Sequence, residues 1–252
     1  MTNYTPTTYW EQHLRNRQGL LGTGHRRFSL DYNIKMYAAA TANLEAALKR
    51  SQTPLTGAAI LDVGSGFGYY VDKYLTWGAR SVTGVDLTQV AVEHLQREFP
   101  GQHFAQADIS EPGWRVGGTF DLVSAISMIF HIVEPARFQN ALVNLCRQVN
   151  ASGRLLIVDA FRPQFWPTAA HARLRTLDAY TPTLKQEGFS IVGLYPMHRW
   201  LGRAFVPGLG PAILSWGPIL TRLARWEGSL GRAPEPKPGW LNILIAQRDS
   251  SV

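Results

Sequence analysis

The sequence predicts an α/β protein with an open, doubly wound sheet, and three observations lead to this prediction. The apolar run 60–63 ends at a glycine-spaced turn, which opens a helical pattern over 69–75. Further short apolar runs alternate with helical patterns as far as residue 195. The second run ends in an acid, Asp86, about 20 residues after the turn. This order is typical of folds that bind a ligand at the carboxyl ends of their strands.

Residues 1–50 are predicted to be mostly helical. Helical patterns cover 9–15 and 34–48, and a glycine-punctuated loop separates them. A polar linker, 51–57, then leads into the first strand.

The glycine-spaced turn indicates the kind of ligand it holds. Gly64, Gly66 and Gly68 permit positive φ and let a ligand lie against bare backbone, facing the N–H groups of the next helix. The third glycine comes one residue earlier than in the dinucleotide fingerprint, and Tyr69 holds its place. Asp62 would repel a pyrophosphate and attract an ammonium group. The turn therefore favours a cationic adenosine ligand without phosphate.

This stretch resembles motif I of the class I methyltransferases that use S-adenosylmethionine: Leu61-Asp62-Val63-Gly64-Ser65-Gly66-Phe67-Gly68. The resemblance covers roughly 57–195 and the final strand, and it implies a Rossmann-like sheet of seven strands whose last strand is antiparallel. It also implies S-adenosylmethionine as cofactor. Four residues are then assigned to its methionine end: Asp62, Gly64, Ser65 and Gly66.

Acids at the next two strand ends complete the cofactor site that the resemblance implies. Asp86, with Leu87 after it, is expected to hold the ribose, because a carboxylate accepts hydrogen bonds from both hydroxyls. Asp108 and Ile109 match the place that binds adenine. Ala125, in the fourth strand over 120–128, is expected along the cofactor.

The acceptor is expected beyond that fourth strand. By resemblance Ser127, Met128 and His131 face the transferred methyl group. His131 is expected to be the only histidine at this edge, and it is a candidate general base or, alternatively, a structural residue. The strand lacks both a cysteine and the Asn/Asp-Pro-Pro-Tyr motif, which favours a small organic acceptor over nucleic acid. Aromatic residues expected to line its pocket, or else to pack the helices onto the sheet, are Trp10, Tyr32 and Phe161, with His25 and Tyr37 as further lid candidates.

The C-terminal half completes the sheet and carries an insertion. A turn is predicted over 150–153 and a strand over 154–159. Helices are predicted over 168–179 and 181–187, and strands over 190–195 and 240–247. We expect an N-terminal helical lid (1–50), a cofactor-binding core (51–195), an aromatic-rich cap (196–239) and the last strand with a tail (240–252). The apolar stretch 212–226 favours a packed cap over an interfacial membrane helix, and Pro218 interrupts any continuous helix there.

Composition and charge limit the compartments and binding partners that the protein can have. The net charge of +7 comes from both flanks, since 1–50 and 195–252 each carry seven basic and three acidic residues. Basic flanks leave peripheral membrane contact open. The sequence contains no apolar run of membrane-spanning length and no signal peptide pattern, so a cytoplasmic enzyme is expected. The single cysteine, Cys146, is interpreted as a small buried hydrophobe, and no metal site is expected.

The sequence thus predicts methyl transfer to a small organic acceptor, at oxygen, in specialised metabolism. Alternatives are a nucleic-acid or membrane-lipid methyltransferase that uses the basic flanks, a nicotinamide oxidoreductase, and a cofactor-binding protein without catalysis. The acceptor's identity and the oligomeric state are not specified by these patterns.

Overall fold

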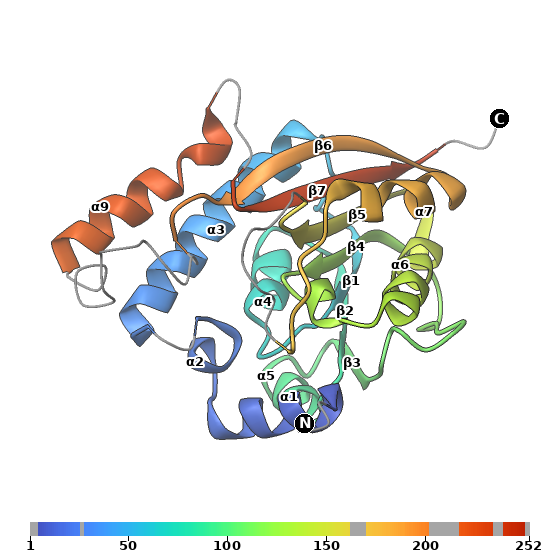
Figure 1. The fold of residues 1–252 in the computed structure, drawn as a ribbon, viewed down its shortest axis with the longest axis horizontal. Helices are drawn as coiled ribbons and strands as arrows, with labels where there is room; N and C mark the ends of the chain where they lie inside the picture. The colour runs from blue at the N-terminus through green and yellow to red at the C-terminus, as the bar shows by residue number, and fades with distance from the viewer. Residues whose placement is uncertain (1–4, 26–27, 162–169, 202–216, 234–238, 250–252) are drawn as a thin grey trace.

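The computed structural model describes residues 5–25, 28–161, 170–201, 217–233 and 239–249. Within these residues seven strands form one sheet in the order β3-β2-β1-β4-β5-β7-β6 (Figure 1). The strands are β1 (Ala59–Val63), β2 (Ser81–Asp86), β3 (His103–Gln106), β4 (Phe120–Ile126), β5 (Val149–Asp159), β6 (Phe189–His198) and β7 (Leu241–Arg248). β1 to β5 pair in parallel, and β7 is antiparallel to β5 and β6. The predicted doubly wound sheet with an antiparallel last strand is confirmed.

Helices cover both faces of the sheet because its central strands are apolar on both sides. On one face, buried residues such as Leu44, Tyr74 and Leu95 come from α3 (Leu30–Arg50), α4 (Tyr69–Thr76) and α5 (Gln89–Glu98). On the other face the core residues include Leu142 of α6 (Pro135–Gln148) and Leu184 of α7 (Thr181–Gln186). Cys146 lies in this second core with no exposed surface, as its interpretation as a buried hydrophobe requires.

Three N-terminal helices precede the sheet: α1 (Pro6–Asn16), α2 (Leu20–Thr23) and α3. Ser29 caps α3, since its side chain accepts a hydrogen bond from the Tyr32 N–H. α1 lies against α5 (Figure 1), where the Glu11 carboxylate accepts a hydrogen bond of 2.8 Å from the Gln89 N–H. This contact satisfies a free N–H at the start of α5 and fixes α1 above the carboxyl ends of the strands.

Two expectations for the region after β4 are wrong. The predicted turn at 150–153 belongs to β5, which begins at Val149 and is irregular there, because Asn150 bonds to Asp121 on β4. The predicted helix over 168–179 is absent from its described part, 170–179, apart from the short 3-10 helix η2 (Leu177–Ala179). Thr176 instead makes a parallel bridge to Phe161, which holds this segment extended beside the end of β5.

The insertion packs on the N-terminal helices. Its helix α9 (Gly217–Glu227) has Pro218 as its second residue, so the proline lies in the first turn, where it does not interrupt the described helix. α9 lies alongside α3 (Figure 1), with Leu220 fully buried against Phe28 and Tyr32. The described part of the predicted cap is therefore packed on the domain, whereas 202–216 and 234–238 lie outside the described residues. In the parts of the chain that the structure describes, no helix is long and apolar enough to span a membrane.

Candidate cofactor and acceptor site

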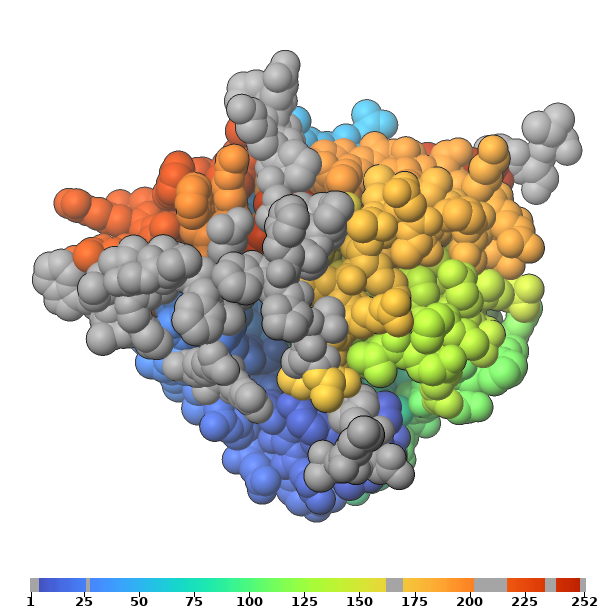
Figure 2. All heavy atoms as spheres, in the orientation of Figure 1, coloured from blue at the N-terminus to red at the C-terminus, as the bar shows by residue number. Residues whose placement is uncertain are grey.

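One cavity of about 590 Å³ lies at the carboxyl ends of the strands, within the size range of small-molecule sites. Its walls come from α1, α2 and α3 on one side, and from the strand ends and the segment after residue 170 on the other. Figure 2 shows that segment, in yellow, against the blue N-terminal helices. The cavity holds most of the residues that the sequence singled out, including Asp62, Asp86, Asp108 and His131.

The glycine turn has the geometry that its spacing predicted. Gly64, Gly66 and Gly68 have φ values of 74°, 52° and 83°, a region that side chains disfavour. A Cβ on Gly64 would lie 2.8 Å from the Cβ of Met128. α4 begins directly after Gly68, so its first N–H groups lie behind the turn. Bare backbone is therefore required here by neighbouring atoms as well as by conformation.

Asp62 is buried, and no cationic side chain among the described residues forms an ion pair with it. Only 3% of its surface is exposed, and its Oδ1 accepts a hydrogen bond of 2.6 Å from the Ser124 hydroxyl. Burial raises the pKa of Asp62 to about 6, and Ser124 partly opposes this shift. A ligand ammonium beside this carboxylate would stabilise its ionised form.

Asp86 ends β2 and is tied into the glycine turn. Its Oδ2 accepts a hydrogen bond of 2.9 Å from the Gly66 N–H, and its Oδ1 accepts from the N–H and hydroxyl of Thr88. Burial raises the pKa of Asp86 despite these bonds. Each carboxylate oxygen can accept more than one hydrogen bond, so Asp86 can hold the turn and also accept from a ligand hydroxyl.

Asp108 follows β3 and also faces the cavity, with Ile109 and Leu87 nearby in its lining. Its Oδ2 accepts a hydrogen bond of 2.5 Å from the Arg137 guanidinium, and its Oδ1 accepts from Ser110. Arg137 therefore orients this carboxylate, a contact that the sequence pattern did not indicate.

Trp10 and His131 meet on the opposite wall. Their rings make an edge contact with centroids 4.5 Å apart, and the Nδ1 of His131 lies 2.7 Å from the His171 carbonyl oxygen. Burial lowers the pKa of His131 to about 4, so the imidazole is neutral at pH 7. Because Nδ1 donates to the carbonyl, Nε2 carries the lone pair.

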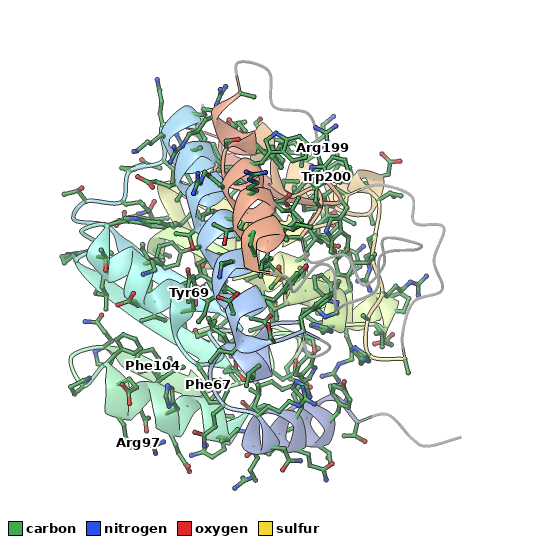
Figure 3. The ribbon with its side chains drawn as sticks, turned by 90° about the vertical axis from the view of Figure 1, so that its left-hand side faces the viewer. Phe67, Tyr69, Arg97, Phe104, Arg199 and Trp200 are labelled. Carbon is green, nitrogen blue, oxygen red and sulfur yellow. The ribbon has the colours of Figure 1, made fainter. Side chains whose placement is uncertain are left out.

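The expectation that His131 is the only histidine at this edge is wrong. Four more histidines line the same cavity: His13, His25, His171 and His198. They come from α1, from the loop after α2, from the segment after residue 170 and from the end of β6. Sequence reasoning also missed Tyr69 and Tyr70, which directly follow the glycine turn; Figure 3 shows Tyr69 beside α3, where its hydroxyl lies 2.9 Å from that of Thr41.

Three predicted site residues are not among the described residues that line the cavity. Tyr32 stacks on Phe28 at 4.0 Å and is 1% exposed, because it lies on the face of α3 that packs against α9. Phe161 packs edge-on against Tyr180 in the core below. Ala125 is fully buried within β4. Ser127 and Met128, which follow β4, do line the cavity.

Fold and site together define a class of α/β protein with a ligand-sized cavity at a glycine turn. A family model described as "Methyltransferase domain" matches residues 60–153. This match confirms the resemblance of the glycine motif to the S-adenosylmethionine-dependent methyltransferases, and S-adenosylmethionine is the cofactor that such a domain uses.

Similar proteins include a ubiquinone biosynthesis O-methyltransferase of Albidiferax ferrireducens, 31% identical over 99 residues that cover 37% of this chain and 39% of the relative. A probable S-adenosylmethionine-dependent methyltransferase of Mycobacterium tuberculosis is 28% identical over 141 residues, 54% of this chain and 50% of the relative. The chain thus spans half or less of the length of these curated relatives. The structure of magnesium protoporphyrin IX methyltransferase from Synechocystis PCC 6803 with bound S-adenosylmethionine aligns over 99% of this chain and 100% of that chain, with a TM-score of 0.60 and 16% identity.

Proposed function

We propose that this protein transfers the methyl group of S-adenosylmethionine to a small organic acceptor, at an oxygen atom. One observation carries the proposal: a single cavity joins the glycine turn and its buried acids to a mainly apolar wall that bears histidines. The names of two similar proteins, a ubiquinone biosynthesis O-methyltransferase and a magnesium protoporphyrin IX methyltransferase, both refer to small organic molecules. They support the same acceptor class for this chain.

The residues of the cavity fit the cofactor. Asp62 is a buried carboxylate suited to the ammonium of the methionine end, beside Gly64, Ser65 and Gly66. Asp86 with Leu87 would hold the ribose, and Asp108 with Ile109 the adenine. The bound cofactor supplies a methyl group that already carries a good leaving group. The protein therefore has to align the acceptor and exclude water, which contributes on the order of 7–11 kcal/mol.

The proposal is tested by calorimetry with S-adenosylmethionine and its demethylated product, followed by mass spectrometry of acceptors incubated with labelled cofactor. We expect both nucleosides to bind and a labelled ether to form. Binding of NADH without binding of either nucleoside would contradict the cofactor assignment. Cofactor binding without any labelled product would favour a non-catalytic binding protein.

Cofactor affinity is expected to depend on pH through Asp62. Its pKa is raised to about 6, so the carboxyl is protonated below that pH and must lose its proton to pair with an ammonium. Affinity should therefore rise between pH 5 and 7, by up to about tenfold per unit below pH 6, and level off above. Asp62→Asn should bind more weakly at pH 7 and lose most of this dependence. An unchanged slope in calorimetry of that variant would contradict the assignment.

His131 is proposed as the general base for the acceptor hydroxyl. His131→Ala should lower kcat by about 10²–10⁴-fold while cofactor affinity stays unchanged. Because its pKa is about 4, the wild-type imidazole stays neutral from pH 6 to 8, and kcat should not fall over that range through its protonation. His94→Ala, on α5 and outside the described cavity lining, is the matched control. Near-normal turnover of His131→Ala at saturating acceptor would overturn the role.

A further inference from the structure

A second polar group faces the cavity at the far edge of the sheet. His198 ends β6, is 6% exposed and lines the cavity. Its Nδ1 is one of four buried side-chain N or O atoms in the described residues that have no hydrogen-bond partner, and it lies 3.6 Å from Oε1 of Glu227. Buried polar atoms are normally hydrogen-bonded, so this nitrogen and the carboxylate beside it are best considered as a pair.

Glu227 is fixed in place by the backbone. It ends α9, has no exposed surface and accepts hydrogen bonds from the N–H groups of Arg199 and Trp200, at 2.5 Å and 3.0 Å. Asn43 of α3 reinforces this junction, since its side chain donates to the carbonyls of both Met197 and Glu227. Figure 3 shows Arg199 and Trp200 beside α9. The carboxylate is therefore held next to the His198 ring by three separate elements.

A fixed carboxylate beside Nδ1 favours the tautomer with its proton on that nitrogen. Nε2 then carries the lone pair and is left to accept a hydrogen bond. The group that fits it is a hydroxyl or another hydrogen-bond donor of a bound molecule.

The strand register places His198 far from Met128, the residue that the resemblance assigns to the transferred methyl group. Ile126, Val158, Ile243 and Tyr195 form one row across β4, β5, β7 and β6. Met128 and His198 lie two and three residues beyond this row, on strands that are three spacings apart. Neighbouring strands lie about 4.8 Å apart, which gives a separation of about 14 Å. The described lining near His198 is mainly apolar and includes Met36, Ala40, Met197, Trp240 and Leu241.

We propose that His198, oriented by Glu227, anchors the end of the acceptor remote from the methylated atom. The acceptor is then an elongated, mainly apolar molecule that carries a hydroxyl or similar donor about 14 Å from its nucleophile. This inference rests on the proposed function and assigns the substrate class of the same cavity. His198 is a binding residue at that distance, whereas His131 lies beside the chemistry.

The tautomer provides a test that needs no acceptor. Nitrogen-15 NMR of the full chain, labelled at histidine and saturated with S-adenosylhomocysteine, is compared with His198→Gln to assign the ring. We expect a protonated Nδ1 and an unprotonated Nε2 in the wild type. In Glu227→Ala the acceptor beside Nδ1 is lost, and the proton should no longer prefer Nδ1. A wild-type ring with its proton on Nε2 overturns the proposal.

Binding of matched probes tests the anchor itself. Two phenols carry the same alkyl chain, long enough to span about 14 Å, ended in one by a hydroxyl and in the other by a methyl group. Calorimetry on the complex with S-adenosylhomocysteine should show about tenfold tighter binding of the hydroxyl probe to the wild type. His198→Ala should lose this preference, and the exposed His103→Ala should retain it.

Three outcomes of the calorimetry are distinct. A wild type without a preference between the probes overturns the anchor, as does a His198→Ala that keeps the preference. Failure of S-adenosylhomocysteine to bind in the first place contradicts the proposed function instead.

Discussion

Gly64→Ala is expected to abolish measurable cofactor binding at ordinary ligand concentrations and to destabilise the fold. The new Cβ would lie 2.8 Å from both Cβ and Cγ of Met128, and Gly64 has a φ of 74°. The left-handed conformation alone costs about 1–3 kcal/mol. Relief of the contact requires movement of Met128 or of the turn itself, and both line the cavity. Thermal unfolding and calorimetry with S-adenosylhomocysteine measure the two effects.

Substitutions at two other glycines separate the effect of backbone strain from the effect of the contact with Met128. Gly113 has a φ of 71° and Gly101 has no positive φ, and a Cβ added at either position would meet no atom within 4 Å. Gly113→Ala should therefore cost stability through backbone strain alone, and Gly101→Ala should cost almost nothing. Both should bind the cofactor normally. A Gly64→Ala protein that binds like these two would show that the turn does not contact the ligand.

Asp86→Ala is expected to raise the cofactor dissociation constant by about 10- to 150-fold. One hydrogen bond from a ribose hydroxyl to a charged group contributes about 1.5–3 kcal/mol. The variant also leaves the Gly66 N–H and both donors of Thr88 without their acceptor, so the turn loses its tether to β2. Asp86→Asn keeps the shape of the side chain and one acceptor oxygen. Its cofactor dissociation constant should therefore lie between those of Asp86→Ala and the wild type.

Asp72→Ala is the matched control for charge. Asp72 lies on α4, shortly after the same turn, with its side chain 55% exposed and paired with Lys73. Its removal changes the net charge by the same amount and should leave cofactor affinity within about twofold, because exposed pairs contribute little. Equal losses in the two variants, measured by calorimetry, would assign the effect to long-range charge and contradict a ribose contact.

The sheet and the acidic side of the cavity could be predicted because local patterns determine both. A buried parallel strand needs an apolar run, and the residue that follows it must lie at the ligand-binding edge. Asp62 is the last but one residue of β1, Asp86 ends β2 and Asp108 follows β3, so their meeting follows from the strand order.

The opposite wall depends on how the flanking segments fold over the sheet. Tyr32 and Tyr37 are five residues apart on α3, which rotates them by about 140° around the helix. Two residues so placed cannot both face the cavity, although both were predicted from the sequence to do so. Tyr32 packs against α9, and Tyr37 therefore lines the cavity. His171 and His198 likewise reach the cavity through an irregular segment and a strand end, and no local spacing links them to His131.

Because β7 runs antiparallel to β6, the chain returns to the sheet at the same edge at which β6 ends. β6 ends at His198, β7 begins at Leu241, and the Trp240 N–H donates to the His198 carbonyl oxygen at 2.8 Å. The segment between them therefore starts and finishes at the cavity wall that His198 and Leu241 line, while the sheet's hydrogen bonding is already complete without it. A change in the length or sequence of that segment can therefore alter this wall of the cavity and leave the strands that carry the glycine turn and its acids unchanged.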